Sequence, residues 1–357
     1  MNAHIYETFH QLVRLGIGTS KDERVPNNIV WTQLKALADA QGLTAIVLDG
    51  LDKCNAKELP LQLKLEWIGE VLQNYELRYK QYEQVISSLA GFYNQHGFKM
   101  MLLKGYVCSL DWPKPNHRPC GDIDIWQFGQ WKEADAALAK EKGIKIDSSH
   151  HHHTVFNWQG FSVENHYDFI NVHHHKSHVE FEKMLKELGQ DDSYTVEVNG
   201  EKVYLSSPNL HALFLIKHLM LHFSTGEITL RQLLDWAFFV EKHGKEIDWE
   251  WLEGVLDKFG MKDLYNVFKA ICVGDLGFDV HIFKQVQFDP SLKDKVLADI
   301  LSPEFGSEIP RNVFKRVVWK WHRWKANEWK HKLCYKESMW SAFWSGVWSH
   351  LLKPSSI

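Results

Sequence analysis

Apolar residues recur at helical spacing over the first hundred residues of the chain. Ile5, Phe9 and Leu12 keep this spacing near the start, and a longer apolar stripe runs from residue 61 to about residue 96. Steps of three and four residues place such side chains on one face of an α-helix. We therefore predict that residues 1–96 form an N-terminal helical region.

The pattern changes to short apolar runs of strand length in the next hundred residues. The runs that predict strands are 98–103, 122–128, 154–158, 161–169, 194–198 and 202–205, with a helix at 131–142 between the second and the third. Gln159-Gly160 and Asn199-Gly200 are two-residue turn signals, so the last four runs predict two hairpins. We expect residues 97–207 to form a mixed α/β core.

Helical periodicity returns from Pro208 onward. The predicted helices are 210–223, 228–242, 247–259 and 264–273. We predict a C-terminal helical region over 208–310, followed by a basic, Trp-rich helical tail over 311–357. The predicted fold class is therefore α+β, with a mixed β-sheet domain flanked by N-terminal and C-terminal helical regions.

Composition narrows the class of protein without selecting a function. Of the 357 residues, 45% are hydrophobic and 24% are charged, which is typical of a chain that buries a core. A formal net charge of −4 gives no global case for a nucleic-acid partner. The five cysteines are scattered and form no Cys-x-x-Cys pair, and no apolar stretch predicts a signal peptide or a membrane span. We expect a reduced, cytoplasmic protein.

Two carboxylates stand out in the middle region. Asp122 and Asp124 are two residues apart on a predicted strand, so both side chains leave the same face of the sheet. Neighbouring carboxylates repel each other unless a cation lies between them, and Mg²⁺ prefers such oxygen ligands together with phosphates and water. An isolated Asp-x-Asp pair more often lies on a solvated edge, so the pair needs support from its surroundings.

Residues suited to phosphate binding precede these carboxylates. Gly105 directly follows a predicted strand, where the absence of a side chain lets a phosphate approach the backbone. Lys104 and Arg118 supply positive charge for the same phosphates. The order of strand, Lys-Gly, Arg and Gly-Asp-x-Asp favours a phosphate-handling site.

These residues also carry a resemblance to a known family. Leu103-Lys104-Gly105, a Pro-rich loop and then Arg118-x-x-Gly121-Asp122-Ile123-Asp124 resemble the uncharacterised bacterial nucleotidyltransferases. The resemblance implies a fold of the DNA polymerase beta type, in which a Gly-containing turn and an Asp-x-Asp strand bind a metal-bound nucleoside triphosphate. It implies that the nucleotide-binding residues are Lys104, Gly105, Arg118 and Gly121, and that the catalytic and metal-binding residues include Asp122 and Asp124.

The resemblance further implies a third acidic residue on a neighbouring strand. Glu164 is our candidate, because alternation places it on the polar face of the predicted strand 161–169. Asp168 is the second choice, and Glu180 is a weaker one because it lies beyond that strand. Two departures from the wider fold are the Lys-Gly turn, where many members have Gly-Ser, and the long interval between Gly105 and Asp122.

The function implied by the resemblance is transfer of a nucleoside monophosphate from a nucleoside triphosphate, with Mg²⁺ or Mn²⁺ as the cofactor. The acceptor is left open among a small molecule, a sugar, a protein and an RNA. A second hypothesis is a non-catalytic module that binds nucleotides or polyanions. A third is a His-rich protein that binds a transition metal.

Histidines cluster in the second half of the predicted core. His150–His153, His173–His175 and His178 suggest Zn²⁺, Ni²⁺ or Cu²⁺ binding. Against this, only alternate residues of a strand share a face. His153 or His166 could instead face the nucleotide or the acceptor, since both are close in sequence to Glu164.

The tail combines positive charge with tryptophan. Residues 311–336 hold nine Lys or Arg and one acidic residue, Glu328, with four tryptophans interleaved. Such a segment can bind an anionic lipid surface or a polyanion, and contact of this kind through 311–352 is one interpretation. We favour the other, in which the tryptophans pack on the rest of the chain while the cations stay solvated.

Overall fold

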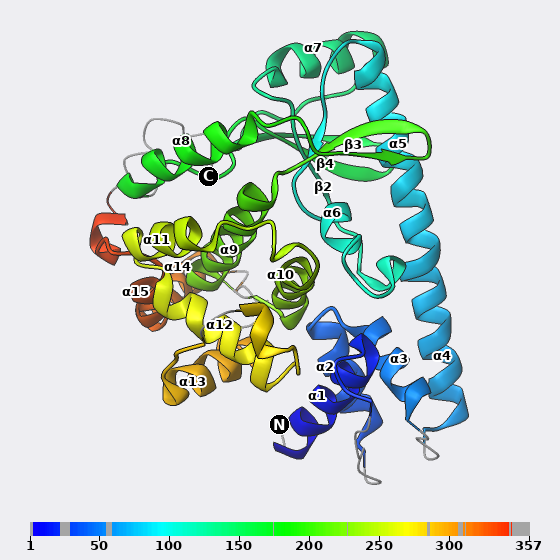
Figure 1. Ribbon diagram of the computed structural model, residues 1–357, viewed down its shortest axis with the longest axis vertical. Coiled ribbons are helices and arrows are strands. Elements are labelled where there is room, and N and C mark those ends of the chain that lie inside the picture. Colours follow the sequence, from blue (N-terminus) through cyan, green and yellow to red (C-terminus); the bar gives the residue numbers. More distant parts are fainter. Residues whose placement is uncertain are drawn as a thin grey trace. The chain divides into compact units, whose positions relative to one another are not determined.

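The computed structural model describes residues 3–21, 29–54, 59–173, 175–226, 228–283, 286–305, 310, 312–342 and 344. The chain divides into two compact units (Figure 1). One is helical and comprises Met1–Val71, Ile216–Lys245 and Trp249–Met339, and the other is mixed and comprises Leu72–Leu215, Glu246–Asp248 and Trp340–Ile357. The earlier division into four segments, 1–96, 97–207, 208–310 and 311–357, stays a prediction.

A six-stranded mixed sheet is the centre of the mixed unit. Its strands are β1 (Met101–Leu102), β2 (Ile123–Trp126), β3 (His153–Trp158), β4 (Phe161–His166), β5 (Thr195–Val198) and β6 (Glu201–Leu205), in the spatial order β3-β4-β2-β1-β6-β5. Strands β2 and β4 pair in parallel, as do β1 and β6. The other three pairings are antiparallel. The predicted α+β class is confirmed.

Helices complete this unit. They are the π-helix η1 (Leu72–Leu77), α5 (Arg78–Gln95), the short α6 (Tyr106–Ser109), the 3₁₀-helix η2 (Pro115–His117), α7 (Trp131–Lys142) and α8 (Lys176–Gly189), and the unit also holds the first part of α9 (Pro208–Thr225). The apolar face of the sheet packs against α5 and α7, with Ile123, Ile125 and Val163 fully buried among Leu89 and Leu138. Burying this face leaves the other side of β2 and β4 for polar chemistry.

Local sequence signals explain the two hairpins. Gln159 and Gly160 have φ values of 50° and 89°, and Asn199 and Gly200 have values of 48° and 85°. Both central residues have positive φ in type I′ turns, whose twist matches that of the flanking strands. The two predicted hairpins are therefore confirmed. The predicted helix at 131–142 is confirmed by α7.

The helical unit is built from the two ends of the chain. Its helices are α1 (Ala3–Ile17), α2 (Trp31–Ala40), α3 (Thr44–Lys53), α4 (Leu61–Val71), the end of α9, α10 (Leu230–His243), α11 (Trp249–Lys258), α12 (Lys262–Gly274), the 3₁₀-helix η3 (Val280–Phe283), α13 (Pro290–Leu301), α14 (Val313–Ala326) and α15 (Glu328–Cys334). The buried Gln41 side chain joins early and late helices, since it donates to the carbonyl of Ile300 and accepts from the N–H of Leu230, both at 2.9 Å. No helix in the described ranges has both the length and the apolar character needed to cross a lipid bilayer.

The predicted tail is partly described, and residues 345–357 lie outside the described part. Trp329 packs edge-on against Phe223, with the ring centroids 5.6 Å apart. Trp321 is 46% exposed and stacks on Trp324. Some of the tryptophans thus pack on the unit while others reach solvent, and contact of the tail with a membrane or a polyanion stays a prediction.

Candidate functional site

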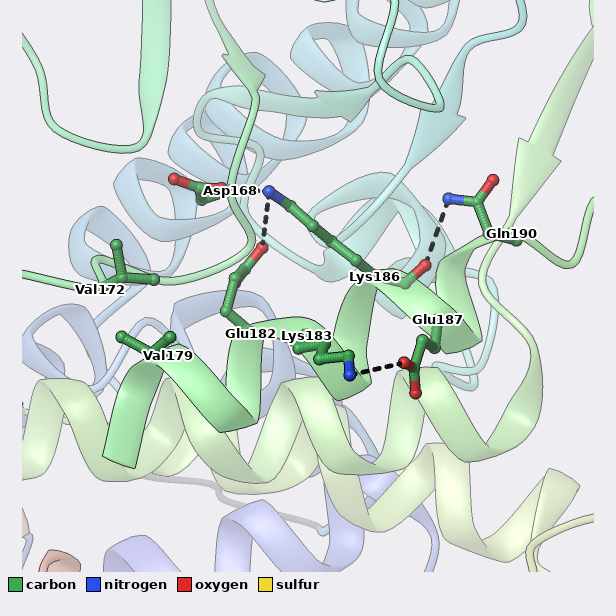
Figure 2. A pocket seen from close by; sticks show the side chains of 8 residues that line it. All are labelled: Asp168, Val172, Val179, Glu182, Lys183, Lys186, Glu187 and Gln190. Carbon is green, nitrogen blue, oxygen red and sulfur yellow. Dashed lines mark hydrogen bonds and ion pairs between the residues drawn. The ribbon is translucent and has the colours of Figure 1, made fainter. Parts of the chain in front are cut away.

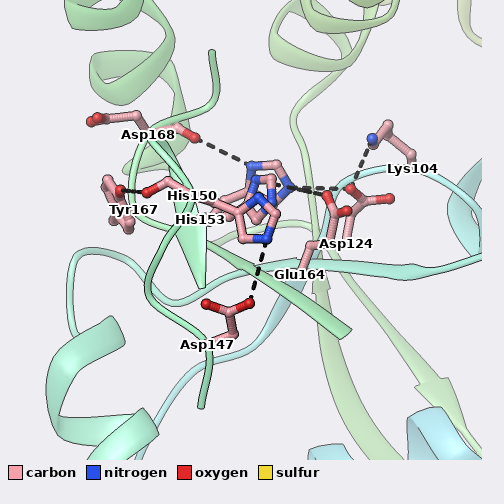
Figure 3. A network of polar contacts seen from close by, with 9 residues as sticks. Lys104, Asp124, Asp147, His150, His153, Glu164, Tyr167 and Asp168 are labelled. Atoms are coloured by element: carbon pink, nitrogen blue, oxygen red, sulfur yellow. Dashed lines mark hydrogen bonds and ion pairs between the residues drawn. The ribbon is translucent and has the colours of Figure 1, made fainter. Parts of the chain in front are cut away.

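Lys104, Asp124 and Glu164 come together on the polar face of the sheet (Figure 3). Asp124 on β2 and Glu164 on β4 are direct partners in the parallel register. The Lys104 ammonium lies 2.8 Å from Oδ1 of Asp124. Three of the residues named from the sequence therefore form one cluster.

Strand alternation explains why these carboxylates face away from the core. The neighbours Ile123 and Ile125 are fully buried in the apolar cluster, so Asp124 between them must leave the opposite face. The Asp124 side chain is only 2% exposed, whereas that of Glu164 is 25% exposed. The site therefore grades from a buried carboxylate to one that reaches solvent.

His166 belongs to the same cluster. Its Nε2 lies 3.1 Å from Oδ1 of Asp124 and 3.6 Å from Oε2 of Glu164. Its Nδ1 lies 3.2 Å from the carbonyl oxygen of Asp168, which can only accept, so Nδ1 is the donor. The sequence contained a signal for this position, because His166 is two residues after Glu164 and leaves the same face of β4. We considered it as a nucleotide or acceptor contact, but not as a metal ligand.

Opposite charges stabilise the ionised forms of this cluster. Burial by itself would raise the pKa of Asp124, but the Lys104 ammonium and the His166 imidazole hold it well below its usual range. Burial likewise opposes the charged forms of Lys104 and His166, yet the adjacent carboxylates raise the pKa of Lys104 and raise that of His166 to about 9. Two cations thus neutralise the carboxylate pair.

Asp122 lies at the edge of the cluster. Its side chain is exposed and its residue directly precedes β2. Lost hydration raises the pKa of Asp122, and repulsion from Asp124 and Glu164 raises it further. The backbone carbonyl of Asp122 accepts a hydrogen bond of 2.7 Å from the Tyr82 hydroxyl, which fixes the start of the strand.

Gly105 is required by packing. It has φ of 61°, and a Cβ at this position would lie 2.6 Å from the Tyr82 hydroxyl oxygen. The helix α6 that follows has only four residues, so its N-terminus by itself does not make a phosphate-binding site. Gly121 is exposed, and a Cβ there would meet open space. Nucleotide binding by Gly105 and Gly121 stays a prediction.

Arg118 is a buried residue of the segment that precedes β2. It is 5% exposed, and its guanidinium donates to the carbonyl of Pro119 at 3.2 Å. It also lies near Cys120: burial raises the pKa of that thiol to about 11, and Arg118 opposes the rise. A phosphate contact from Arg118 stays a prediction.

The alternative third acids lie elsewhere. The Asp168 carboxylate forms an ion pair with Lys186 of α8, and Glu180 is an exposed residue of the same helix. Glu182 of α8 was not considered from the sequence. It is buried and accepts the backbone N–H groups of Phe169 and Ile170 at 2.9 and 3.0 Å. These bonds hold the segment that follows His166.

A groove of about 470 Å³ runs along α8 next to Asp168 (Figure 2). Its lining charges form pairs, since Lys183 lies 3.8 Å from Glu187 and Lys186 contacts both Asp168 and Glu182. Because three acidic and two basic residues line the groove, it lacks the excess positive charge that a triphosphate needs. The carboxylate cluster remains the better candidate for chemistry.

The donor set of the cluster fits a divalent cation. One ligand atom each from Asp124, Glu164 and His166 lies within 4.8 Å of the other two. With Nδ1–H on the Asp168 carbonyl, a neutral His166 would present the Nε2 lone pair to a cation, which is how metal-ligating histidines are usually oriented. Asp122 is not a member of this group among the described residues. Metal binding by Asp122, Asp124 and Glu164 stays a prediction.

Comparison with known proteins supports a nucleotidyltransferase relationship. The model of a family described as "Uncharacterised nucleotidyltransferase" matches residues 27–270, which is more than half of the chain. A similar solved structure is that of an antigenic nucleotidyltransferase-like protein from Paracoccidioides brasiliensis, at 17% identity and a TM-score of 0.34, covering 45% of this chain and 75% of that chain. None of the curated proteins matches the chain.

Proposed function

We propose, since the chain belongs to the uncharacterised nucleotidyltransferase family, that it transfers a nucleoside monophosphate from a nucleoside triphosphate to an acceptor in a metal-dependent reaction. The observation that carries this proposal is the direct pairing of Asp124 with Glu164 on neighbouring parallel strands. The fold type that we propose is that of DNA polymerase beta. The acceptor is a small molecule, a sugar, a protein or an RNA.

The proposed reaction is an in-line displacement at the α-phosphorus. The acceptor oxygen forms a bond to this phosphorus, and the bond from phosphorus to the bridging oxygen of the β-phosphate breaks. Pyrophosphate leaves with the electron pair, and the acceptor proton passes to solvent. A divalent cation, Mg²⁺ or Mn²⁺, would neutralise charge on the phosphates when bound.

The chain's own residues have distinct parts in this proposal. Asp124 and Glu164 would hold the cation, and Asp122 would complete the set from the exposed edge. Lys104 would bind phosphate oxygens, and this role is supported by the 16% exposure of its side chain next to Asp124. Arg118, Gly105 and Gly121 are proposed nucleotide contacts that depend on the family resemblance.

Nucleotide-dependent stabilisation tests the proposal. We expect nucleoside triphosphates with Mg²⁺ or Mn²⁺ to raise the melting temperature of the wild-type chain. At a ligand concentration of 100 times the Kd, binding adds about 2.7 kcal/mol to the free energy of unfolding. In the double variant Asp122→Asn/Asp124→Asn this metal-dependent stabilisation should disappear, because the cation loses two carboxylates. Thermal shift over a panel of nucleotides, with and without each cation, measures the effect.

The control is Glu180→Gln, which removes an exposed acid of α8. It should leave nucleotide stabilisation unchanged, and the melting curve of each variant without ligand checks that it folds. Equal stabilisation of the wild type and the double variant would refute the assignment of the site. Stabilisation of the wild type without pyrophosphate release, over a broad set of acceptors, would favour the non-catalytic binding module.

A further inference from the structure

A second group of metal-binding side chains adjoins the carboxylates. One ring nitrogen each from His152, His153 and His166 lies within 4.8 Å of the other two. The ring centroids of His152 and His153 are 4.3 Å apart, and that of His166 lies 5.6 and 5.2 Å from them. Three imidazoles at this separation form a possible donor set for a metal ion.

The backbone holds these histidines in place. His153 on β3 and His166 on β4 are direct partners in the antiparallel register, so their side chains share one face. His152 precedes β3, which begins at His153, so strand alternation does not apply to it. Its carbonyl accepts the N–H groups of Tyr167 and Asp168 at 3.0 and 3.1 Å. The site is therefore built on a hairpin rather than on a mobile chain end.

Two of these imidazoles have unsatisfied buried nitrogens. Within the described part of the chain, Nδ1 of His152 and Nδ1 of His153 are buried without a hydrogen-bond partner, and His153 is only 6% exposed. Leaving a buried polar atom unpaired destabilises the folded chain. A ligand that accepts nitrogen lone pairs would offset this cost at both residues together.

We propose that His152, His153 and His166 form a binding site for a transition-metal ion of the Zn²⁺ class, which adjoins the carboxylate group and shares His166 with it. Imidazole nitrogen suits Zn²⁺, Co²⁺ and Ni²⁺, whereas Mg²⁺ requires oxygen. Oε2 of Glu164 lies 3.8 Å from Nδ1 of His153 and 3.6 Å from Nε2 of His166, so it can supply an oxygen ligand. Three His ligands with one further position are a known zinc arrangement.

Zinc titration of the metal-stripped full-length chain tests this proposal. In competition with a chromophoric chelator and with Mg²⁺ in excess, we expect one tight Zn²⁺ per chain. His152→Gln and His153→Gln should each weaken Zn²⁺ binding by about 100-fold or more, because loss of an outer-shell partner alone typically costs 10–100-fold. The visible absorption of Co²⁺ should report nitrogen ligation in the wild type and change in both variants.

The matched control is another close histidine pair, His218 and His222 of α9, whose ring centroids are 4.3 Å apart. The variant His218→Gln/His222→Gln should keep the tight Zn²⁺ site. If it loses that site, or if the His152 and His153 variants bind Zn²⁺ as the wild type does, the proposal is wrong. The outcome is independent of the proposed transferase function, since Zn²⁺ binding is measured without nucleotide.

Discussion

Replacing Lys104 with Met is expected to destabilise the chain by about 3 kcal/mol when divalent cations are chelated. The substitution removes the ammonium that lies 2.8 Å from Asp124 and leaves a carboxylate with a 2% exposed side chain beside His166 alone. Breaking a buried ion pair by removing one partner typically costs 3–5 kcal/mol, and the remaining His166 puts the loss near the lower limit. Urea unfolding in the presence of EDTA measures it.

The same variant reports on cation binding. Without Lys104, a divalent cation at Asp124 no longer competes with an ammonium, so Mn²⁺ or Mg²⁺ should stabilise Lys104→Met more than the wild type. The double variant Lys104→Met/Asp124→Asn should recover most of the lost stability, because no buried charge is left without its partner.

Lys99→Met is the matched surface control for this experiment. Lys99 forms an ion pair with Asp192 in which both side chains are nearly half exposed, and such pairs contribute little to stability. A Lys104→Met variant as stable as Lys99→Met, or equal stabilisation of the wild type and Lys104→Met by cations, would show that Lys104 does not balance Asp124 as we propose.

The elements of this fold that could be predicted are those with a strong local signal. Gln159-Gly160 and Asn199-Gly200 specify their turns by themselves, and the period of apolar residues specifies α7 and α10. The strand predicted over 98–103 is reduced to Met101–Leu102, and that over 161–169 ends at His166. Strand ends depend on pairing with distant segments, which no local pattern contains.

The apolar residues of α3 and α8 do not follow the helical period closely enough to predict these helices from the sequence. Most of α3 is buried on every side, so its apolar residues do not form a stripe. In α8 the buried face includes His178 and Glu182 together with Phe181 and Leu185, so polar residues interrupt the apolar pattern. Glu182 is buried because it accepts two backbone N–H groups, and this role depends on tertiary contacts alone.

The site shows the same division between local and long-range information. Alternation places Asp124 and Glu164 on polar strand faces, but only the parallel register of β2 and β4 shows that they are neighbours. The position of His166 between them depends on this register and on the Asp168 carbonyl. Similarly, His152 joins His153 and His166 because β3 begins one residue after it. Strand alternation counted against that arrangement, because only alternate residues of a strand share a face.

The two candidate metal sites share one ligand residue. His166 contributes a nitrogen to both donor groups, one with Asp124 and Glu164 and the other with His152 and His153. A cation at the carboxylates and an ion at the imidazoles would therefore compete for one ligand. Substitutions at His152 and His153 separate the two sites, because neither residue belongs to the carboxylate group.

Replacing Lys217 with Met is expected to stabilise the chain by about 3 kcal/mol at pH 7. Lys217 on α9 is 2% exposed, with its ammonium 4.6 Å from the centre of the Tyr335 ring. Burial lowers the pKa of Lys217 from 10.5 to about 8, partly offset by Cys334 and Glu337. Each unit of pKa corresponds to about 1.4 kcal/mol, so the charged form is disfavoured in the folded state by about 3 kcal/mol.

The sign of the pH dependence follows from the lowered pKa. As pH falls from 10.5 to 8, the unfolded chain binds a proton at Lys217 before the folded chain does, so the wild type loses stability over this window and gains none below it. The methionine side chain of the variant does not titrate. The advantage of Lys217→Met should therefore be largest at pH 7 and should fall to about 1 kcal/mol by pH 10. Urea unfolding of both chains at the two pH values measures this difference.

Lys330→Met provides a control of opposite sign. Lys330 is also buried, but its ammonium lies 2.5 Å from the Asp299 carboxylate, so its loss leaves a shielded acid without its cation. This variant should be less stable than the wild type at pH 7, whereas Lys217→Met should be more stable. If Lys217→Met is also destabilising, or if its effect does not change between pH 7 and pH 10, then Lys217 contributes to stability as a cation. Its contact with the Tyr335 ring would in that case outweigh the cost of burial.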